Sequence, residues 1–444
     1  MKKKIIISCI LAAAALLSPA NSSAQPASWR GHIIASSPQE GNIIVRKWTD
    51  HFVVSAYQES GRQFFTINRI YDFLSNTPGA VVSPSTDTAG IPGGLVVSDF
   101  CIVGDTLFLC GTKGTEPAFG WLLLDATLYV PYYCHIYTIN ASPIAQLDKI
   151  LVYKENGYHH MVALGSNATS SFIVEMPHMF IDTTTVLTAC MNYTSPVLKD
   201  RLDDLEELDN MLVFTGQDTR AGNNIATVRL VGKTNELVNS YDLNTQYRIS
   251  QGAYSVTGPV LTSRTADFSN FAMACELEGP GYTYLMRLHN LLAPSTSGLQ
   301  LLSTQDVPAL NMDLLREMTY LNADIVLLLF HRHTYDSYIL PAPLLATSSY
   351  TTNAFRQLGK LFMSMDRLGG NAFVSWGDSH DLLLQKNGAP ACIGTETFLV
   401  SPGPVNAVNP IVDSPVRKIY TVTGIHEDFR WGNVNINVDC NMNY

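Results

Sequence analysis

The sequence has few basic residues and lacks the short motifs that mark common catalytic sites. Its 28 lysines and arginines are outnumbered by 38 aspartates and glutamates, which gives a net charge of −10. An acidic surface repels phosphate backbones, so nucleic-acid binding is not expected. No G-x-S-x-G elbow, H-E-x-x-H zinc motif, phosphate-binding loop or dinucleotide fingerprint occurs. The sequence therefore assigns no catalytic residue, no metal ligand and no cofactor.

Helical periodicity and long apolar runs are also scarce. Beyond the N-terminal segment, the longest aliphatic run, 323–330, has the length of a strand and is too short for a transmembrane helix. Only 198–210 has a pattern compatible with a helical turn. The sequence therefore predicts an all-β fold with no transmembrane segment in the mature chain.

Cysteines are dispersed and show no C-x-x-C spacing. Cys9 lies in the N-terminal apolar run, and the other seven are Cys101, Cys110, Cys134, Cys190, Cys275, Cys392 and Cys440. An odd number without clustered spacing is not typical of a disulfide framework or a zinc cluster. We expect most of these cysteines to be buried free thiols.

The N-terminus has the pattern of a secretory signal peptide. Lys2, Lys3 and Lys4 precede an apolar run from Ile5 to Leu17, and small residues end at Ala24. That run is too short to span a bilayer, so we expect cleavage after Ala24. Residues 1–24 are the predicted leader, and the mature protein is expected to be extracytoplasmic, whether periplasmic, on the cell surface or secreted.

A five-residue, mainly apolar run follows an Asp, Asn or Gly turn and recurs with a period of roughly 54 residues. The copies are Val53–Tyr57, Leu107–Gly111, Met161–Gly165, Leu212–Gly216, Ala272–Glu276, Val326–Phe330, Phe373–Gly377 and, more weakly, Asp428–Gly432. Each copy lies among β-prone runs divided by turn residues, four where the copy is complete. A lone four-stranded sheet cannot bury both faces, so neighbouring copies must cover one another.

This repeat resembles the β-propeller superfamily along residues 25–444. The resemblance implies one all-β domain of four-stranded antiparallel blades. The eighth copy ends after three strands, and the stretch at His32 resembles an outer strand, so we predict eight blades closed by pairing of the N- and C-terminal strands. Seven blades, with the eighth copy as an appendage, is the alternative. No named subfamily motif is present, so the fold implies no activity.

Two charged stretches could be metal sites. His331 and His333 are two residues apart, and Asp336 could complete a three-ligand set, but we favour a polar hairpin tip. The acidic set Asp203, Asp204, Glu206, Glu207 and Asp209 lacks the spacing of a calcium loop. We favour the interpretation that this acidic set forms a solvent-exposed face of the protein.

An aromatic stretch and two long connections could also serve a ligand. Tyr133, His135 and Tyr137 alternate onto one face, where they could stack on sugars, although covering a neighbouring blade is the more common use. The connections at 76–94 and 291–311 are long enough to be decoration or binding loops.

In a propeller, the tips between second and third strands share an axial face with the blade-to-blade connections. Loops on a rigid ring can vary without disturbing the core, so we expect function at this face. The binding residues expected on this face are Lys113, Glu116, Asp218, Arg220, Glu278, His331, His333, Asp336, Asp378 and His380.

The leading prediction is an exported, non-catalytic module that binds a protein partner or a polysaccharide through this face. The alternative is an extracytoplasmic glycan hydrolase or lyase whose acids converge at the central channel. A purely structural role in an envelope assembly is a third hypothesis. Paired channel carboxylates with raised pKa values would favour the enzyme.

Overall fold

The chain is all-β in every part that the structure describes. The structure is a computed structural model, and it describes residues 26–34, 43–59, 61–70, 85–91, 94–125, 130–155, 157–176, 185–192, 200–208, 211–220, 223–233, 245–249, 255–264, 271–277, 282–288, 299–303, 314–322, 324–332, 336–343, 348–370, 372–377, 381–386, 392–402, 408–410, 416–426 and 430–443. Strands β1 to β32 account for its regular structure, and none of the described residues is helical.

Strands β2 to β28 form successive antiparallel groups. The first group is β2 (Ile44–Thr49), β3 (Phe52–Glu59), β4 (Arg62–Arg69) and β5 (Ser85–Ile91). The second is β6 (Leu95–Val103), β7 (Thr106–Lys113), β8 (Glu116–Asp125) and β9 (Val130–Ile139). The third is β10 (Gln146–Glu155), β11 (Tyr158–Ser166), β12 (Ser171–Met176) and β13 (Thr185–Asn192). The fourth is β14 (Asp200–Leu208), β15 (Met211–Arg220), β16 (Asn223–Gly232) and β17 (Thr245–Ile249).

Three more groups follow. The fifth is β18 (Leu261–Arg264), β19 (Phe271–Leu277), β20 (Tyr282–Leu288) and β21 (Leu299–Ser303). The sixth is β22 (Leu314–Tyr320), β23 (Ile325–Arg332), β24 (Asp336–Pro343) and β25 (Tyr350–Gln357). The seventh contains β26 (Phe362–Gly369), β27 (Ala372–Gly377) and β28 (Asp381–Lys386), and its fourth strand is β1 (Pro26–Ile34) from the other end of the chain.

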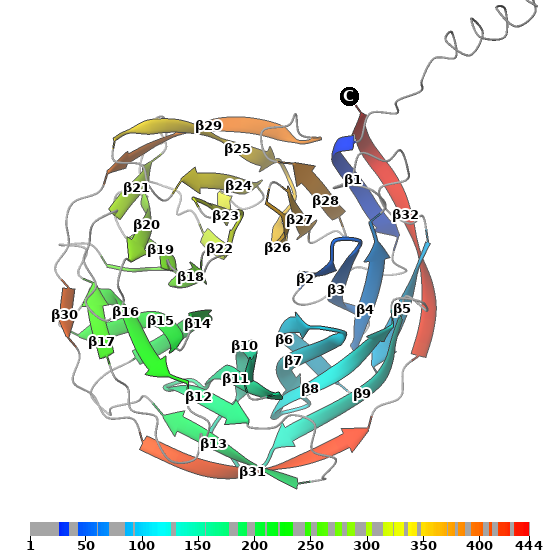
Figure 1. Cartoon of the computed structure of the whole chain (residues 1–444), viewed down its shortest axis with the longest axis vertical. Helices are drawn as coiled ribbons and strands as arrows, with labels where there is room; N and C mark the ends of the chain where they lie inside the picture. The colour runs from blue at the N-terminus through cyan, green and yellow to red at the C-terminus, as the bar shows by residue number, and fades with distance from the viewer. Residues whose placement is uncertain are drawn as a thin grey trace, which may run out of the picture.

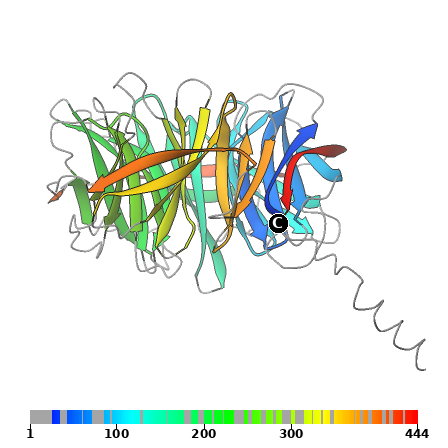
Figure 2. The same cartoon turned by 90° about the horizontal axis from the view of Figure 1, so that it is seen from above.

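The groups are arranged around a ring in a propeller-like manner. The first strand of each group lies innermost and the fourth lies outermost (Figure 1). Seen from the side, the strands form a thick disc (Figure 2). The described strands thus have the radial, antiparallel arrangement that the repeat predicted.

The C-terminal strands lie outside this ring and are here called the belt. They are β29 (Gly394–Pro402), β30 (Val408–Pro410), β31 (Val416–His426) and β32 (Arg430–Asn443). Strand β29 lies between β21 and β25, β31 lies between β13 and β9, and β32 lies between β5 and β1, while β30 pairs with β17. Figure 1 shows the belt, orange to red, running around the periphery. It therefore covers the outer edge of every group.

The core lies mainly between adjacent groups. One buried cluster joins Phe65 and Ile67 of β4 to Phe100 and Leu109 of the next group. Another joins Tyr57 of β3 to Trp376 of β27, whose rings stack with centroids 6.2 Å apart. Each group is covered by its neighbours, as the repeat implied.

The chain ends and the cysteines agree only in part with what the sequence predicts. Strands β31 and β32 do not pair with each other, so the segment expected to be an eighth group does not form one, and that part of the prediction is wrong. The N-terminal strand β1 does pair with the C-terminal strand β32. Residues 1–24 lie outside the described residues. Cys101, Cys110, Cys134 and Cys275 are free thiols, but Cys392 is disulfide-bonded.

Candidate functional site at the central channel

The innermost strands surround a central channel that contains two cavities. The mouth cavity, of about 360 Å³, is lined mainly by residues near the beginning of β2, β6, β10, β22 and β26, including Gln146, Asp148 and Arg316. The inner cavity, of about 170 Å³, is lined by residues further along the inner strands, including Asp204 and Glu206. Arg46, Asp99, Lys149 and Glu317 line both cavities. These four shared residues therefore lie between the mouth cavity and the inner cavity.

A β-bulge precedes the channel residue in several inner strands. The register shifts lie between Val97 and Asp99, Leu147 and Lys149, Leu202 and Asp204, Leu315 and Glu317, and Phe362 and Ser364. A bulge re-aims the side chains that follow it. The repeat therefore places a polar residue from each of these strands along the channel.

Glycine at the end of the five-residue run is explained by the same bulge. Gly111 pairs with Val97 and Gly216 pairs with Leu202, each directly before the register shift. A Cβ atom at Gly111 would collide with the carbonyl of Val96, and one at Gly216 with the carbonyl of Arg201. Neither glycine has a positive φ. These glycines are therefore required for close backbone approach.

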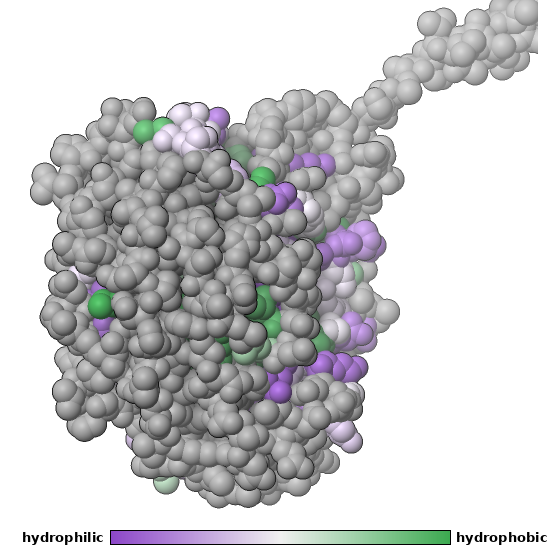
Figure 3. All heavy atoms as spheres, turned by 60° about the vertical axis from the view of Figure 1, so that its left-hand side comes forward, coloured by the Kyte–Doolittle hydropathy of each residue, from purple (hydrophilic) through white to green (hydrophobic). Residues whose placement is uncertain are grey.

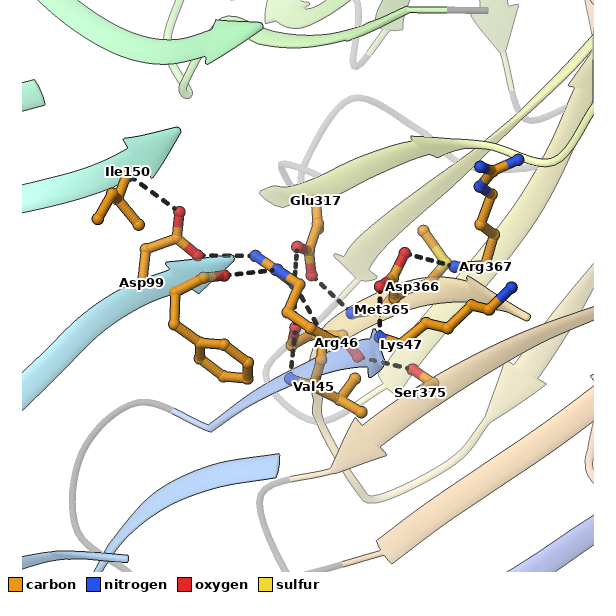
Figure 4. A network of polar contacts seen from close by, with 12 residues as sticks. Val45, Arg46, Lys47, Asp99, Ile150, Glu317, Met365, Asp366, Arg367 and Ser375 are labelled. Carbon is orange, nitrogen blue, oxygen red and sulfur yellow. Dashed lines mark hydrogen bonds and ion pairs between the residues drawn. The ribbon is translucent and has the colours of Figure 1, made fainter. Parts of the chain in front are cut away.

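Arg46 of β2 is the centre of a polar network that joins the first group to the second, sixth and seventh (Figure 4). Its Nη2 lies 2.8 Å from Oδ1 of Asp99, and its Nη1 lies 2.8 Å from Oε1 of Glu317. Its Nε donates to the carbonyl of Phe100 at 3.2 Å. Burial acts to lower the pKa of Arg46, but the charges of Glu317 and Asp99 outweigh it and raise the pKa. Arg46 therefore stays charged in a half-buried ion cluster.

The channel carboxylates also bind backbone N–H groups of the next group around the ring. The pairs are Asp99 with Ile150 (3.2 Å), Asp204 with Thr262 (2.9 Å), Glu317 with Met365 (2.6 Å) and Asp366 with Lys47 (2.6 Å). An inner strand is a sheet edge, whose N–H groups need partners from outside the sheet. These carboxylates supply such partners and fasten adjacent groups together.

Two acids of the inner cavity have strongly raised pKa values. Burial raises the pKa of Glu206 to about 7, although Arg264 lies 3.4 Å away and opposes the shift. Burial raises the pKa of Asp204 to about 6, against the opposing charge of Lys149. For Lys149, burial lowers the pKa, but Asp204, Asp99 and Glu317 raise it more. The inner cavity thus holds carboxyls that titrate near neutral pH beside a lysine that stays protonated.

Glu206→Gln is expected to stabilise the protein at pH 8 but not at pH 4.5. The folded-state pKa of Glu206 exceeds its unfolded value, so the folded state binds more protons between pH 4.5 and 7, and stability falls as the pH rises through this window. Removing the charge should raise the free energy of unfolding at pH 8 by up to about 3 kcal/mol. Urea unfolding at both pH values measures this difference.

The neighbouring Glu207→Gln is the matched control for Glu206→Gln. Glu207 forms an ion pair with Lys233 at 2.5 Å. Neutralising Glu207 should therefore lower the stability of the protein at pH 8. Equal effects of Glu206→Gln at pH 4.5 and pH 8 would contradict the raised pKa.

Six of the ten binding residues expected from the sequence lie in the described part of the chain. Lys113 and Glu116 face each other across the β7–β8 hairpin, and Glu116 is exposed. Arg220 ends β15. Asp218 and His331 are buried, so neither side chain is exposed to a partner at the surface. Glu278, His333, Asp378 and His380 lie outside the described residues.

His331 and Asp336 have structural contacts. The Nε2 atom of His331 lies 2.6 Å from the carbonyl oxygen of Phe362, and its Nδ1 accepts a hydrogen bond from Arg316. Asp336 accepts hydrogen bonds from Arg356 and from the N–H of Gly359. No group of three metal-ligating side chains occurs among the residues that the structure describes.

The acidic set and the aromatic stretch also pack within the ring. Asp203 and Asp204, expected on a solvated face or in a helical turn, lie in β14, and Asp203 accepts a hydrogen bond from the N–H of Val260. Tyr133 and Tyr137 stack on Trp121 and Phe119 respectively, each with centroids 5.1 Å apart. Tyr137 belongs to the core shared with the third group, which agrees with covering a neighbour. Asp209 lies outside the described residues.

Sequence reasoning missed the channel residues Arg46, Asp99, Lys149, Glu317 and Asp366. The available signal was the polar residue that recurs in the first strand of each repeat copy.

Of the described residues, none forms a helix that is long and apolar enough to cross a membrane.

Comparison with known proteins gives no relative by sequence: no family model matches, and no curated protein does. Among solved structures, the WD40 domain of Toxoplasma gondii coronin is similar at 8% identity, covering 85% of this chain and 87% of that chain, with a TM-score of 0.45. A Bombyx mori GH32 β-fructofuranosidase variant in complex with sucrose matches at 10% identity, covering 92% and 94%, with a TM-score of 0.22. At these scores neither likeness assigns a family or an activity to the chain.

Proposed function

We propose that residues 25–444 form a closed seven-bladed β-propeller, exported by the leader, that binds a saccharide in the mouth cavity without catalysis. The observation that carries this proposal is the mouth cavity itself. Its volume of about 360 Å³ falls in the range of small-molecule sites, and residues of five inner strands contribute to it. The seven groups supply the blades, and β1 supplies the strand that completes the last one.

The polar groups of the mouth cavity suit a polyhydroxylated ligand. Lys149 and Arg316 offer donors, Asp148 offers acceptors, and the Gln146 amide offers both. Lys149 lines both cavities, and the charges of Asp204, Asp99 and Glu317 keep it protonated, so it can donate hydrogen bonds to a ligand. Sugar hydroxyls both donate and accept, which matches this mixture.

The described surface gives less support for a protein partner. Only two large hydrophobic side chains of the described residues are well exposed, Tyr158 (56%) and Leu358 (58%). Figure 3 shows several strongly hydrophilic residues of the described chain on the right-hand side of this face. Protein interfaces usually depend on buried aromatic or aliphatic anchors.

A glycan hydrolase remains the second candidate, because Asp204 and Glu206 have raised pKa values in one cavity. Against it, the carboxylates of the inner cavity have structural partners. Asp204 accepts a hydrogen bond from the N–H of Thr262. Glu206 accepts a hydrogen bond from the N–H of Glu207 and forms an ion pair with Arg264. A general acid must be free to reach its substrate.

A glycan array, followed by calorimetry with the best ligand, tests the binding function. We expect Lys149→Gln and Arg316→Gln each to weaken binding by about tenfold or more, because each removes a charged hydrogen bond. Lys154→Gln is the matched control, since Lys154 is exposed in the same strand as Lys149 and does not line the mouth cavity.

Two results would contradict the proposal. One is unchanged affinity in both cavity variants. The other is cleavage of the bound glycan by the wild type and its loss in Glu206→Gln, which would establish the hydrolase.

A further inference from the structure

The belt begins beside the place where it ends. The N–H of Cys392, just before β29, donates to the Ser28 hydroxyl of β1 at 2.7 Å. Strand β1 also pairs with β32, the last strand of the belt. Figure 1 shows the C-terminus beside β1 and β32, after the belt has passed around the ring. Both ends of the belt therefore lie at the same strand.

Cys392 is disulfide-bonded, and few cysteines can be its partner. Cys101, Cys110, Cys134 and Cys275 are free, and Cys9 belongs to the predicted leader. Cys190 and Cys440 are therefore the remaining candidates for the disulfide partner of Cys392.

Strand register distinguishes Cys190 from Cys440 as the partner of Cys392. Cys440 is opposite Arg30 in the β1–β32 pair, and Met442 is opposite Ser28, the residue that Cys392 contacts. Cys190 is opposite Lys418 in the β13–β31 pair, which belongs to a different sheet and to another part of the ring. Only Cys440 is placed by its backbone near Cys392.

We infer that Cys392 is bonded to Cys440, so that the belt is a covalently closed hoop around the ring. The bond forms when the two thiols lose two protons and two electrons to a disulfide oxidant, which is reduced to two thiols. An oxidising compartment beyond the cytoplasm supplies such oxidants. The hoop holds the outer strands in place even when individual belt hydrogen bonds open, because its ends cannot separate.

Tryptic digestion of the unreduced mature protein tests the linkage directly. Cleavage after Lys386, Arg417 and Arg430 gives the peptides 387–417 and 431–444, each with one cysteine. Mass spectrometry should find them as one cross-linked species that separates on reduction. A link from Cys392 to the peptide 155–199, which contains Cys190, or a free thiol at Cys392, would overturn the inference.

Thermal melting with and without a thiol reductant tests the effect of the hoop. Reduction should lower the melting temperature of the wild type by about 5 °C, because it releases a long closed loop. The variant Cys392→Ser/Cys440→Ser should melt like the reduced wild type and should not respond to reductant. An equal response of wild type and variant would show that another disulfide is responsible.

Discussion

Deletion of Val416–Tyr444 is expected to abolish the single cooperative unfolding transition and to leave an aggregating chain. The deletion removes β31 and β32, which pair with β13, β9, β5 and β1. Each lost backbone hydrogen bond contributes about 0.5–1.5 kcal/mol. Their sum over these four strand pairs reaches or exceeds the roughly 5–15 kcal/mol that typically separates folded from unfolded domains.

The deletion also creates sheet edges, which explains the expected aggregation. The outer strands β5, β9 and β13 would present rows of unpaired N–H and C=O groups, which template pairing with other chains. Size-exclusion chromatography and circular dichroism melting measure the two effects. Cys440→Ser in the full chain is the control, because it removes the proposed disulfide but keeps both strands. A truncated protein that stays monomeric and melts like this control would show that the belt is dispensable.

Arg46→Met is expected to lower the free energy of unfolding at pH 7 by about 3–5 kcal/mol. The substitution removes the cation between Asp99 and Glu317 but keeps most of the side-chain volume. Two partly buried carboxylates are then left without their shared counter-charge. Urea unfolding at pH 7 measures the loss.

The adjacent Lys47→Met provides the control for Arg46→Met. Lys47 forms a surface ion pair with Asp50, which is 67% exposed, so its loss should cost less than about 1 kcal/mol. Adding Asp99→Asn and Glu317→Gln to Arg46→Met should recover part of the stability, because it removes the uncompensated charges. Equal losses for Arg46→Met and Lys47→Met would contradict a structural role for the channel cluster.

The repeat period predicted the strands and their radial packing, because each copy carries its own turn and strand signals. Runs such as Leu107–Gly111 form buried second strands for a local reason, the alternation of turn and apolar residues. The belt could not be found in this way. Its strands β31 and β32 have the same β-prone composition as a blade, but their partners lie far away in the sequence, and local patterns do not encode distant pairing.

The candidate site was less predictable than the fold. His331 and Asp336 have residue types common at functional sites, yet Phe362 and Arg356 hold them in structural contacts that only the tertiary fold brings together. Arg46 and Lys149 looked unremarkable in their strands. Their place in the channel depends on bulges and on the ring, and neither follows from a single repeat copy.

Methionine methyl NMR gives the most direct test of ligand binding in the mouth cavity. Met363 lines the mouth cavity, whereas Met318 and Met365 line the inner cavity. Titration with the saccharide selected by the array should shift the Met363 methyl resonance and leave Met318 and Met365 nearly unchanged. Shifts at Met318 and Met365 with an unchanged Met363 would contradict the proposed binding site and would place the ligand beside Asp204 and Glu206.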